Sequence, residues 1–392
     1  MTEDTLKPEC ARIVLAPDKF KGSLSAAEVV ESMALGCADL GMRDRHVPLA
    51  IADGGDGSVQ AALRSGWSAR PVATVDAWGR SSTTKVAVEG KRAIVEVASI
   101  CGMGGMRLTP QQALTASSFG VGQVIAVLLD DEFDDITVGL GGSATTDGGA
   151  GMLMALGVKL RDAAGAAIEP TGISLLSLAD VDIAGLHPRL ASARLTIACD
   201  VNNPMVGIDG SAEVFGRQKG ADDEAVGKLS AALSHLAAMI EPVVDRLGLS
   251  SSPGSGAAGG LAWAALLLGA ELRSGAELFL TMLGARELMT GAALVVTGEG
   301  SLDAQSLRGK APVGVAALAA ELGVPSVAAV GTNRLVPGGT GAPFAEVVAL
   351  DRIDPRCVDD PALTRSLLRQ VTADLVTRHL TSSGVEFKGV SR

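Results

Sequence analysis

The feature that most limits the fold of this chain is the recurrence of short apolar runs. Several of these runs are followed by a glycine-containing loop and then a helix. Five of these runs stand near the two ends of the chain, at residues 12–16, 47–51, 294–296, 324–330 and 346–350. Buried strands that alternate with helices are typical of a parallel sheet covered by helices. We therefore expect a doubly wound α/β domain built from both ends of the chain, from residues 1–70 and 291–392.

The stretch after residue 70 has a different pattern. Its β-branched residues form short runs separated by turns, at residues 72–75, 84–88 and 93–97, as is typical of antiparallel strands. Further strands are expected at residues 136–140 and 195–199. We therefore expect residues 71–290 to form a second, mixed α/β domain inserted into the first. Ligand sites favour domain interfaces, so we expect the active site in the cleft between the two domains.

Composition excludes several classes of function. The chain has 392 residues, of which 47% are hydrophobic and 20% charged, as in a globular protein of two or three domains. The net charge of −11 argues against nucleic acid or an anionic membrane as a partner. The start, MTEDTLKPEC, lacks a secretion signal, and the five cysteines lack a CxxC motif, so we expect reduced thiols and a cytoplasmic location. A homodimer is one oligomeric state that the sequence leaves open.

The loop at residues 297–310, TGEGSLDAQSLRGK, carries the densest set of reactive side chains. Glu299 and Asp303 place two carboxylates in the turn, and Lys310 stands just before an expected helix. A lysine is unfavourable at a helix N-terminus, where the partial charge is positive, unless an anion binds there. The spacing of a Walker A loop is absent. We therefore favour anion binding at Lys310, with an ordinary strand-to-helix loop as the alternative.

The first two strands also end in charged loops. Asp18, Lys19 and Lys21 follow the first strand, at the sheet edge where open α/β proteins bind ligands. Two lysines there suit a carboxylate or a phosphate, and a solvated turn explains the charge pattern equally well. Asp53 and Asp56 follow the second strand among glycines, where they can hold Mg²⁺ or cap the next helix. Capping accounts for one of these aspartates and not for both.

Residues 139–151, GLGGSATTDGGAG, form the longest loop of small residues. Small side chains leave backbone N–H groups open to a ligand, which is how a polypeptide binds phosphate. Glycine also permits close packing of a helix on a strand, which is the alternative explanation. The length of the loop and its hydroxyl groups favour phosphate binding.

Two further segments bear on function. Asp200 follows the strand at residues 195–199, where it can act as a base or a metal ligand, and Arg217 and Lys219 can offset the charge of a substrate. Residues 253–260, PGSGAAGG, contain a G-x-G-x-x-G spacing. The dinucleotide fingerprint needs an apolar strand directly before that spacing, and none is expected there, so a dehydrogenase is disfavoured.

Six segments, in this order, resemble the type 1 glycerate kinase family. They are APDKFKGSLSA, ADGGDGS, GLGGSATTDGGAG, ACDVNNP with FGRQKGA, PGSGAAGG and TGEGSLDAQSLRGKAPVGVA. The resemblance implies phosphorylation of D-glycerate by ATP with Mg²⁺, and 2-phosphoglycerate as the product. It also implies two α/β domains, one of them flavodoxin-like and discontinuous. Lys19, Asp56 and Thr146 differ from the residues usual in the family, which leaves the fine substrate preference open.

Phosphoryl transfer requires positioning and charge neutralisation more than covalent chemistry, and we assign the charged residues on that basis. The residues expected to act in the chemical step are Asp200 as first choice of base, Asp303 as second choice, and Lys21. Those expected to bind the substrate are Asp18, Lys19, Arg217 and Lys219. Those expected to bind the ATP phosphates are Gly141, Gly142, Ser143, Thr145 and Lys310. Those expected to bind Mg²⁺ are Asp53, Asp56 and Glu299.

Two other functions are alternatives to a glycerate kinase. One is a kinase for another small hydroxy acid, and the other is a non-catalytic protein that binds sugar acids. The full set of carboxylates and lysines disfavours the second of these.

Overall fold

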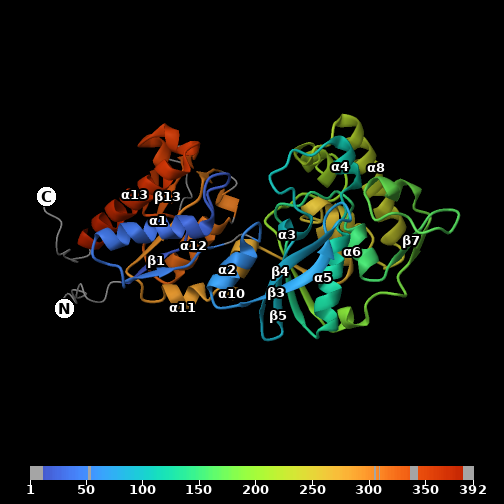
Figure 1. Cartoon of the computed structure of the whole chain (residues 1–392), viewed down its shortest axis with the longest axis horizontal. Coiled ribbons are helices and arrows are strands. Elements are labelled where there is room, and N and C mark those ends of the chain that lie inside the picture. Colours follow the sequence, from blue (N-terminus) through green and yellow to red (C-terminus); the bar gives the residue numbers. More distant parts are fainter. Residues whose placement is uncertain (1–11, 52–53, 304–305, 309, 336–342, 383–392) are drawn as a thin grey trace. The chain divides into compact units, whose positions relative to one another are not determined.

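The computed structural model describes residues 12–51, 54–303, 306–308, 310–335 and 343–382. The chain divides into two compact units. The terminal unit consists of Met1–Asp53 and Ala276–Arg392, and the central unit is the uninterrupted stretch Gly54–Gly275. The terminal unit therefore contains elements from the two ends of the chain, such as α1 in dark blue and α13 in red in Figure 1.

These boundaries differ from those expected at residues 70 and 291. Helix α2 (Ser58–Arg64) belongs to the central unit because it packs on strands β4 (Ser81–Glu89) and β5 (Arg92–Glu96). Helix α10 (Gly275–Met282) packs on α12 (Ala311–Glu321) of the terminal unit, since a Cβ at Gly314 would lie 3.3 Å from the side chain of Leu280. The packing of helices determines where the units begin and end. The change in strand pattern along the sequence contains no information about that packing.

The terminal unit is built on five parallel strands. Their order across the sheet is β15 (Glu346–Ala349), β13 (Ser326–Val330), β11 (Leu294–Thr297), β1 (Ile13–Leu15) and β2 (His46–Pro48). Counted within this unit alone, the order is 2-1-3-4-5, the doubly wound order of flavodoxin-like sheets. The direction of winding changes between β1 and β11. In such sheets a crevice forms there, outside the carboxyl ends of the strands.

Helices pack on this sheet and complete the terminal unit. α1 (Ala26–Asp39) and α13 (Pro361–Ser382) contact each other and share a core with Leu15 and Val296 of the sheet. α12 packs on β11 and β13, and α11 (Ala285–Met289) lies between α10 and β11 in the chain. A small parallel pair, β12 (Ser301–Leu302) and β14 (Thr332–Asn333), follows the carboxyl ends of β11 and β13.

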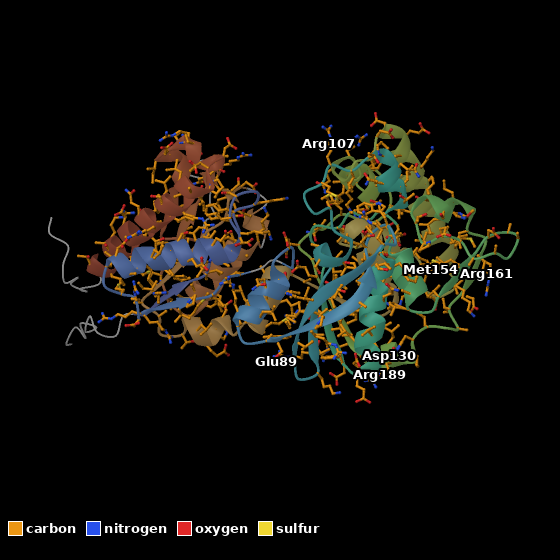
Figure 2. The ribbon with its side chains drawn as sticks, in the orientation of Figure 1. Glu89, Arg107, Asp130, Met154, Arg161 and Arg189 are labelled. Atoms are coloured by element: carbon orange, nitrogen blue, oxygen red, sulfur yellow. The ribbon has the colours of Figure 1, made fainter. Side chains whose placement is uncertain are left out.

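The central unit is built on a six-stranded sheet of mixed direction. Its order is β10 (Glu271–Arg273), β9 (Arg194–Ala198), β6 (Asp135–Gly139), β5, β4 and β3 (Ser68–Val75). Strands β3, β4 and β5 form the expected antiparallel pairs, and the other pairs are parallel. The prediction of a mixed α/β protein with parallel sheets is confirmed. Strands β7 (Lys159–Arg161) and β8 (Asp180–Asp182) form a separate antiparallel pair. Arg161, which is labelled in Figure 2, is ion-paired with Asp180.

Helices surround the central sheet and bury a large apolar core around Trp263. Besides α2 they are α3 (Ala98–Cys101), α4 (Pro110–Thr115), α5 (Phe119–Asp130), α6 (Ala150–Ala155), α7 (Ser211–Phe215), α8 (Asp223–Ile240) and α9 (Leu261–Leu267). By length and composition, the stretch Pro110–Asp130 could cross a membrane. Its α5 packs on β3 and α6, and most of the stretch is buried, as in a core helix of a globular unit.

Capping residues explain where two long helices begin. Ser25 and Glu28 exchange hydrogen bonds at the start of α1 and so form a capping box. Asp222 caps α8 by accepting from the N–H of Ala225 at 2.9 Å. The first of these caps directly follows the charged loop after β1, and it fixes where that loop ends.

Candidate active site

A cavity of about 390 Å³ opens in the terminal unit, among the loops that follow β1, β11 and β13. Its volume is within the usual range for small-molecule sites. The residues that line it are Asp18, Lys19, Phe20, Lys21, Ser23, Glu299, Gly300, Ser301, Asp303, Lys310, Gly331, Thr332, Arg334, Cys357, Val358 and Thr364. The cavity thus brings together all the predicted site residues of the two loops after β1 and β11.

Backbone contacts join these two loops. The N–H of Asp18 donates to the carbonyl of Gly298 at 2.8 Å, and the hydroxyl of Thr297 donates to the carbonyl of Ala16 at 2.6 Å. A Cβ at Gly300 would lie 3.2 Å from the backbone of the first loop, so the close approach favours glycine there. Because β1 and β11 are neighbouring parallel strands, segments far apart in the sequence form one wall of the cavity.

The carboxylates of the cavity lie at different depths. Asp18 and Glu299 are each only 6% exposed, and Asp303 is half-buried. Oδ1 of Asp18 accepts from the N–H of Lys19 at 2.6 Å and lies 4.0 Å from the ammonium group of the same lysine. Oδ1 of Asp303 accepts from the N–H of Ser306 at 3.1 Å. These contacts fix two of the carboxylates through short local turns.

Lys310 occupies the N-cap position of α12, as the sequence predicted. Its side chain reaches the same cavity as Lys21 and Arg334, from a third segment of the chain. Residues 304, 305 and 309 of this loop lie outside the described residues. Three cationic side chains from three segments therefore converge on the cavity.

The glycine-rich loop of the central unit divides into two parts. Gly141 and Gly142 follow β6 and are partly or fully exposed, whereas Ser143 is 4% and Thr145 0% exposed. A Cβ at Gly149 would lie 2.4 Å from the side chain of Ala264, so close packing of α6 on α9 requires glycine there. The packing explanation thus accounts for the second part of the loop and for Gly141, whose N–H donates to the carbonyl of Gly54 at 3.2 Å and where a Cβ would lie 2.4 Å from Cα of Gly55. Gly142 is exposed.

Asp147 organises the buried part of this loop. Its Oδ2 accepts from the N–H and the hydroxyl of Ser118 at 2.8 Å and 2.7 Å, and its Oδ1 accepts from the N–H of Gly149 at 3.1 Å. Burial raises the pKa of this carboxyl, against the effect of these hydrogen bonds. The sequence analysis gave Asp147 no role, although an aspartate just before a helix is a usual capping signal.

Lys219, predicted to bind substrate, lies beneath the same loop and is 4% exposed. Its ammonium group donates to Oγ of Ser143 at 3.1 Å and to the carbonyl of Thr145 at 2.7 Å. Burial lowers the pKa of Lys219 to about 8, and nearby Cys101 and Asp147 act in the opposite direction. In this structure the lysine holds two of the predicted phosphate-binding residues from within the unit.

Arg217 and Asp200 also have partners within the central unit. Arg217 is exposed and is ion-paired with Asp223 at 2.8 Å. Oδ1 of Asp200 accepts from the hydroxyl of Ser274 and the N–H of Gly275, both at 3.0 Å. Asp200 is therefore held just beyond the carboxyl end of β9, where the sequence predicted it.

The described metal candidates belong to different units, Glu299 to the terminal unit and Asp56 to the central unit. Asp53 lies outside the described residues, and Asp56 is exposed near the start of α2. Buried Glu96, at the end of β5, accepts from the N–H groups of Gly57 and Val59 at 3.2 Å and 3.1 Å and so caps α2. Burial raises the pKa of Glu96, and the charge of Asp56 adds to that effect. Within the described part of the chain, no group of three histidine, cysteine or acidic residues could hold a metal ion.

The second glycine segment, residues 253–260, packs on the first. The N–H of Gly148 donates to the carbonyl of Gly259 at 2.9 Å. A Cβ at Gly259 would lie 1.9 Å from the carbonyl oxygen of Thr145, which excludes any larger residue. The G-x-G-x-x-G spacing follows a 3₁₀ turn, Leu249–Ser251, and serves backbone packing between two loops.

Several polar residues of the terminal cavity were missed by the sequence analysis. Among them are Ser301 and Thr332, whose hydroxyl groups are hydrogen-bonded at 3.0 Å, and Arg334. Strands β12 and β14 are two residues long, too short to leave an apolar pattern. Only their pairing in the folded unit brings these side chains to the loop after β11.

Charged side chains and glycine-rich loops at the carboxyl ends of parallel strands define an α/β protein that handles small anionic ligands. The profile of the glycerate kinase family matches residues 13–350. The chain belongs to the glycerate kinase family, and it is accordingly an enzyme of the kinase class.

The relatives include the glycerate 2-kinase of Escherichia coli (strain K12), which is 40% identical over 82% of this chain and 85% of that protein. The glycerate kinase of Halalkalibacterium halodurans is 35% identical over 92% of this chain and 97% of that protein. The crystal structure described as glycerate kinase 2 from Salmonella typhimurium LT2 superposes with a TM-score of 0.78 at 34% identity. That match covers 95% of this chain and all of the other.

Proposed function

We propose that this protein transfers the γ-phosphoryl group of ATP to a hydroxyl group of D-glycerate, giving 2-phosphoglycerate and ADP. The observation that carries the proposal is the terminal cavity, where carboxylates and cationic groups from the loops after β1 and β11 meet in a volume suited to a small acid. Family membership supports it, since a relative at 40% identity is a glycerate 2-kinase.

The proposed chemical step is an in-line displacement. The glycerate hydroxyl oxygen forms a bond to the γ-phosphorus while the bond from that phosphorus to the β–γ bridging oxygen breaks, and ADP leaves. The hydroxyl proton passes to a carboxylate. Asp200 and Asp303 are the two candidates for this base, and each is held by hydrogen bonds at the end of a strand or turn. Lys21 is a candidate for binding the glycerate carboxylate and for neutralising charge on the transferred phosphoryl group.

We assign the ATP phosphates to Gly141, Gly142, Ser143 and Thr145 of the central unit and to Lys310 of the terminal unit. The exposure of Gly141 and Gly142 and the hydrogen bonds that fix the next residues support this assignment. Both units are then needed for one reaction. The expectation of a cleft between the two domains stays a prediction.

A nucleotide-bound Mg²⁺ fits the residues present. Magnesium is usually held by one or two carboxylates together with substrate phosphates and water, so a set of three protein ligands is not required. Asp56 and Glu299 are the described candidates for this role. Bound there, the ion would neutralise charge on the triphosphate.

A coupled ADP-release assay tests the proposed function. Purified protein would be given ATP, Mg²⁺ and one acid at a time from a panel of small hydroxy acids, including D-glycerate, L-glycerate and tartronate. We expect D-glycerate to give the highest kcat/KM. A higher value with another acid would establish the alternative, a kinase for that acid, and the absence of ADP release with every acid would contradict a kinase function.

A further inference from the structure

We propose that the cavity of the terminal unit is the binding site of the hydroxy acid itself, with Lys21 and Arg334 holding its carboxylate. The hydroxyl groups of Ser301 and Thr332 and the carboxylates of the cavity then face the hydroxyl groups of the acid. We refer to this cavity as the acid pocket. The inference rests on the proposed function and adds Arg334, Ser301 and Thr332 to the residues that determine the substrate.

The position of the acid pocket supports a substrate site. Open α/β sheets bind ligands at the point where the direction of winding changes, outside the carboxyl ends of the strands. In the terminal unit this point lies between β1 and β11, and the loops after these two strands supply Lys21 and Glu299 to the pocket. A ligand in the pocket would therefore contact both loops at once.

The charges of the acid pocket suit a small monoanion. Four cationic side chains face three carboxylates: Lys19, Lys21, Lys310 and Arg334 against Asp18, Glu299 and Asp303. Lys19 is paired with Asp18. Within the described part of the chain, Lys21, Lys310 and Arg334 form no ion pair with a carboxylate. The side chains of the pocket carry a net charge of plus one, which complements the single carboxylate of a small acid. A triphosphate would instead place several negative charges beside the three carboxylates of the pocket.

The hydrogen-bonding groups of the acid pocket also favour D-glycerate over a triphosphate as its ligand. A triphosphate offers only acceptor oxygens, and so do the carboxylates of the pocket, unless a metal ion joins them. D-Glycerate offers two hydroxyl donors and one carboxylate, which complement the carboxylates and the cations of the pocket. Asp18 and Glu299 are largely buried, which strengthens hydrogen bonds to them.

Arg334 is the group best placed to select a carboxylate. It is exposed, it follows β14, and its backbone N–H donates to the carbonyl of Leu302 at 2.9 Å, which ties the residue to the loop after β11. A guanidinium group binds a carboxylate with two parallel hydrogen bonds, which a lysine cannot do. Lys310, in the same pocket, is then left to meet the transferred phosphoryl group.

Steady-state kinetics and calorimetry of variants test the acid pocket. Arg334→Gln and Lys21→Gln should each raise KM and Kd for D-glycerate by roughly 10- to 100-fold, since each removes a hydrogen bond to a charged group. The KM for ATP should stay within about twofold, because Lys21 and Arg334 are not among the residues assigned to the ATP phosphates. Arg334→Lys should fall between the wild type and Arg334→Gln. Arg43→Gln is the matched control, because Arg43 is exposed and precedes β2, whereas the pocket lies beyond the carboxyl ends of the strands.

The outcomes separate the pocket from the proposed function. Unchanged KM and Kd for D-glycerate in both Gln variants, or a selective rise in KM for ATP, would overturn the acid pocket and leave the kinase function in place. If the wild-type protein binds D-glycerate without phosphorylating it, and Arg334→Gln abolishes that binding, the pocket stands and the kinase function fails. Thermal unfolding of each variant shows that loss of binding is not loss of fold.

Discussion

The buried lysine beneath the glycine-rich loop gives a pH-dependent test at the scale of single residues. The pKa of Lys219 is about 8 in the folded protein and near 10.5 when the chain is unfolded. Between these values the unfolded state binds more protons, so the free energy of unfolding rises with pH. Relative to Lys219→Met, the wild type should gain roughly 1–3 kcal/mol across this window, measured by urea unfolding.

Lys228→Met is the control for that experiment, because Lys228 lies exposed on α8 in an ion pair with Glu224. The free energies of unfolding of Lys228→Met and the wild type should differ by an amount that changes little over the same pH range. A constant difference for Lys219→Met as well would show that Lys219 is not buried as described.

The identity of the base is tested by Asp200→Asn and Asp303→Asn. Each change keeps the shape of the side chain and removes its ability to accept a proton. The variant that lacks the true base should lose about 10²–10⁴-fold in kcat with its fold intact. Asp222→Asn is a suitable control, since asparagine also caps a helix and α8 should begin as before. Wild-type kcat in both site variants would remove both residues from the chemical step.

The grouping of some candidate residues follows from a local signal, while their roles in the reaction stay predictions. Asp18, Lys21, Glu299 and Asp303 directly follow apolar strands, and they line one cavity. Lys219 has the same kind of signal, a cation near a strand end, but it is buried under the glycine-rich loop. That burial depends on packing between segments over seventy residues apart, which no local pattern contains.

At the scale of elements, two helical glycines should respond in opposite ways to alanine. A Cβ at Gly36 of α1 would lie 2.3 Å from the carbonyl of Arg369 in α13, so Gly36→Ala should separate these helices and cost about 1–3 kcal/mol. A Cβ at Gly227 of α8 meets nothing within 4 Å, so Gly227→Ala should stabilise the protein by about 0.5–1 kcal/mol. Denaturant unfolding measures both changes. A stabilising Gly36→Ala would refute the close contact of α1 with α13.

The bounds of the second strand differ from those that its apolar pattern predicted. The second strand was expected at residues 47–51, but β2 is His46–Pro48. Leu49 and Ile51 are buried at 2% and 1% exposure, and their N–H groups donate to the carbonyls of Leu15 and Pro17 at 2.8 Å and 3.0 Å. Backbone contact with the β1 segment therefore continues beyond the end of β2. The helix starts at Ser25 and Asp222 depend on only a few neighbouring residues, since each side chain accepts from an N–H three residues further on.

At the scale of the whole molecule, each unit closes its own apolar core. One core uses side chains from Val72 to Ala270 only, and the other combines Ile13–Met42 with Leu294–Leu380. Residues 54–275 expressed alone should therefore unfold in one cooperative transition with native near-ultraviolet circular dichroism. Residues 1–53 alone should remain unfolded, because β1 and α1 then lack β11 and α13. A fragment 54–275 without cooperative unfolding would contradict an independent central core.

The alternation of strands and helices was enough to predict the α/β class with parallel sheets. It was not enough to find the acid pocket, because Arg334 and Thr332 approach the loop after β11 only through a two-residue strand pair. A homodimer, a cytoplasmic location and the absence of nucleic acid and membrane partners stay predictions.

The proposed roles of the site residues all serve transfer of the γ-phosphoryl group of ATP to the hydroxyl group at carbon 2 of D-glycerate. Phosphorus and proton NMR of one reaction mixture, with purified protein, D-glycerate, ATP and Mg²⁺, identifies the product of this proposed reaction. We expect equal amounts of ADP and 2-phosphoglycerate, with the phosphorus coupled to the single proton on carbon 2. Phosphorylation at carbon 3, or release of inorganic phosphate without a phosphorylated acid, would refute the proposal.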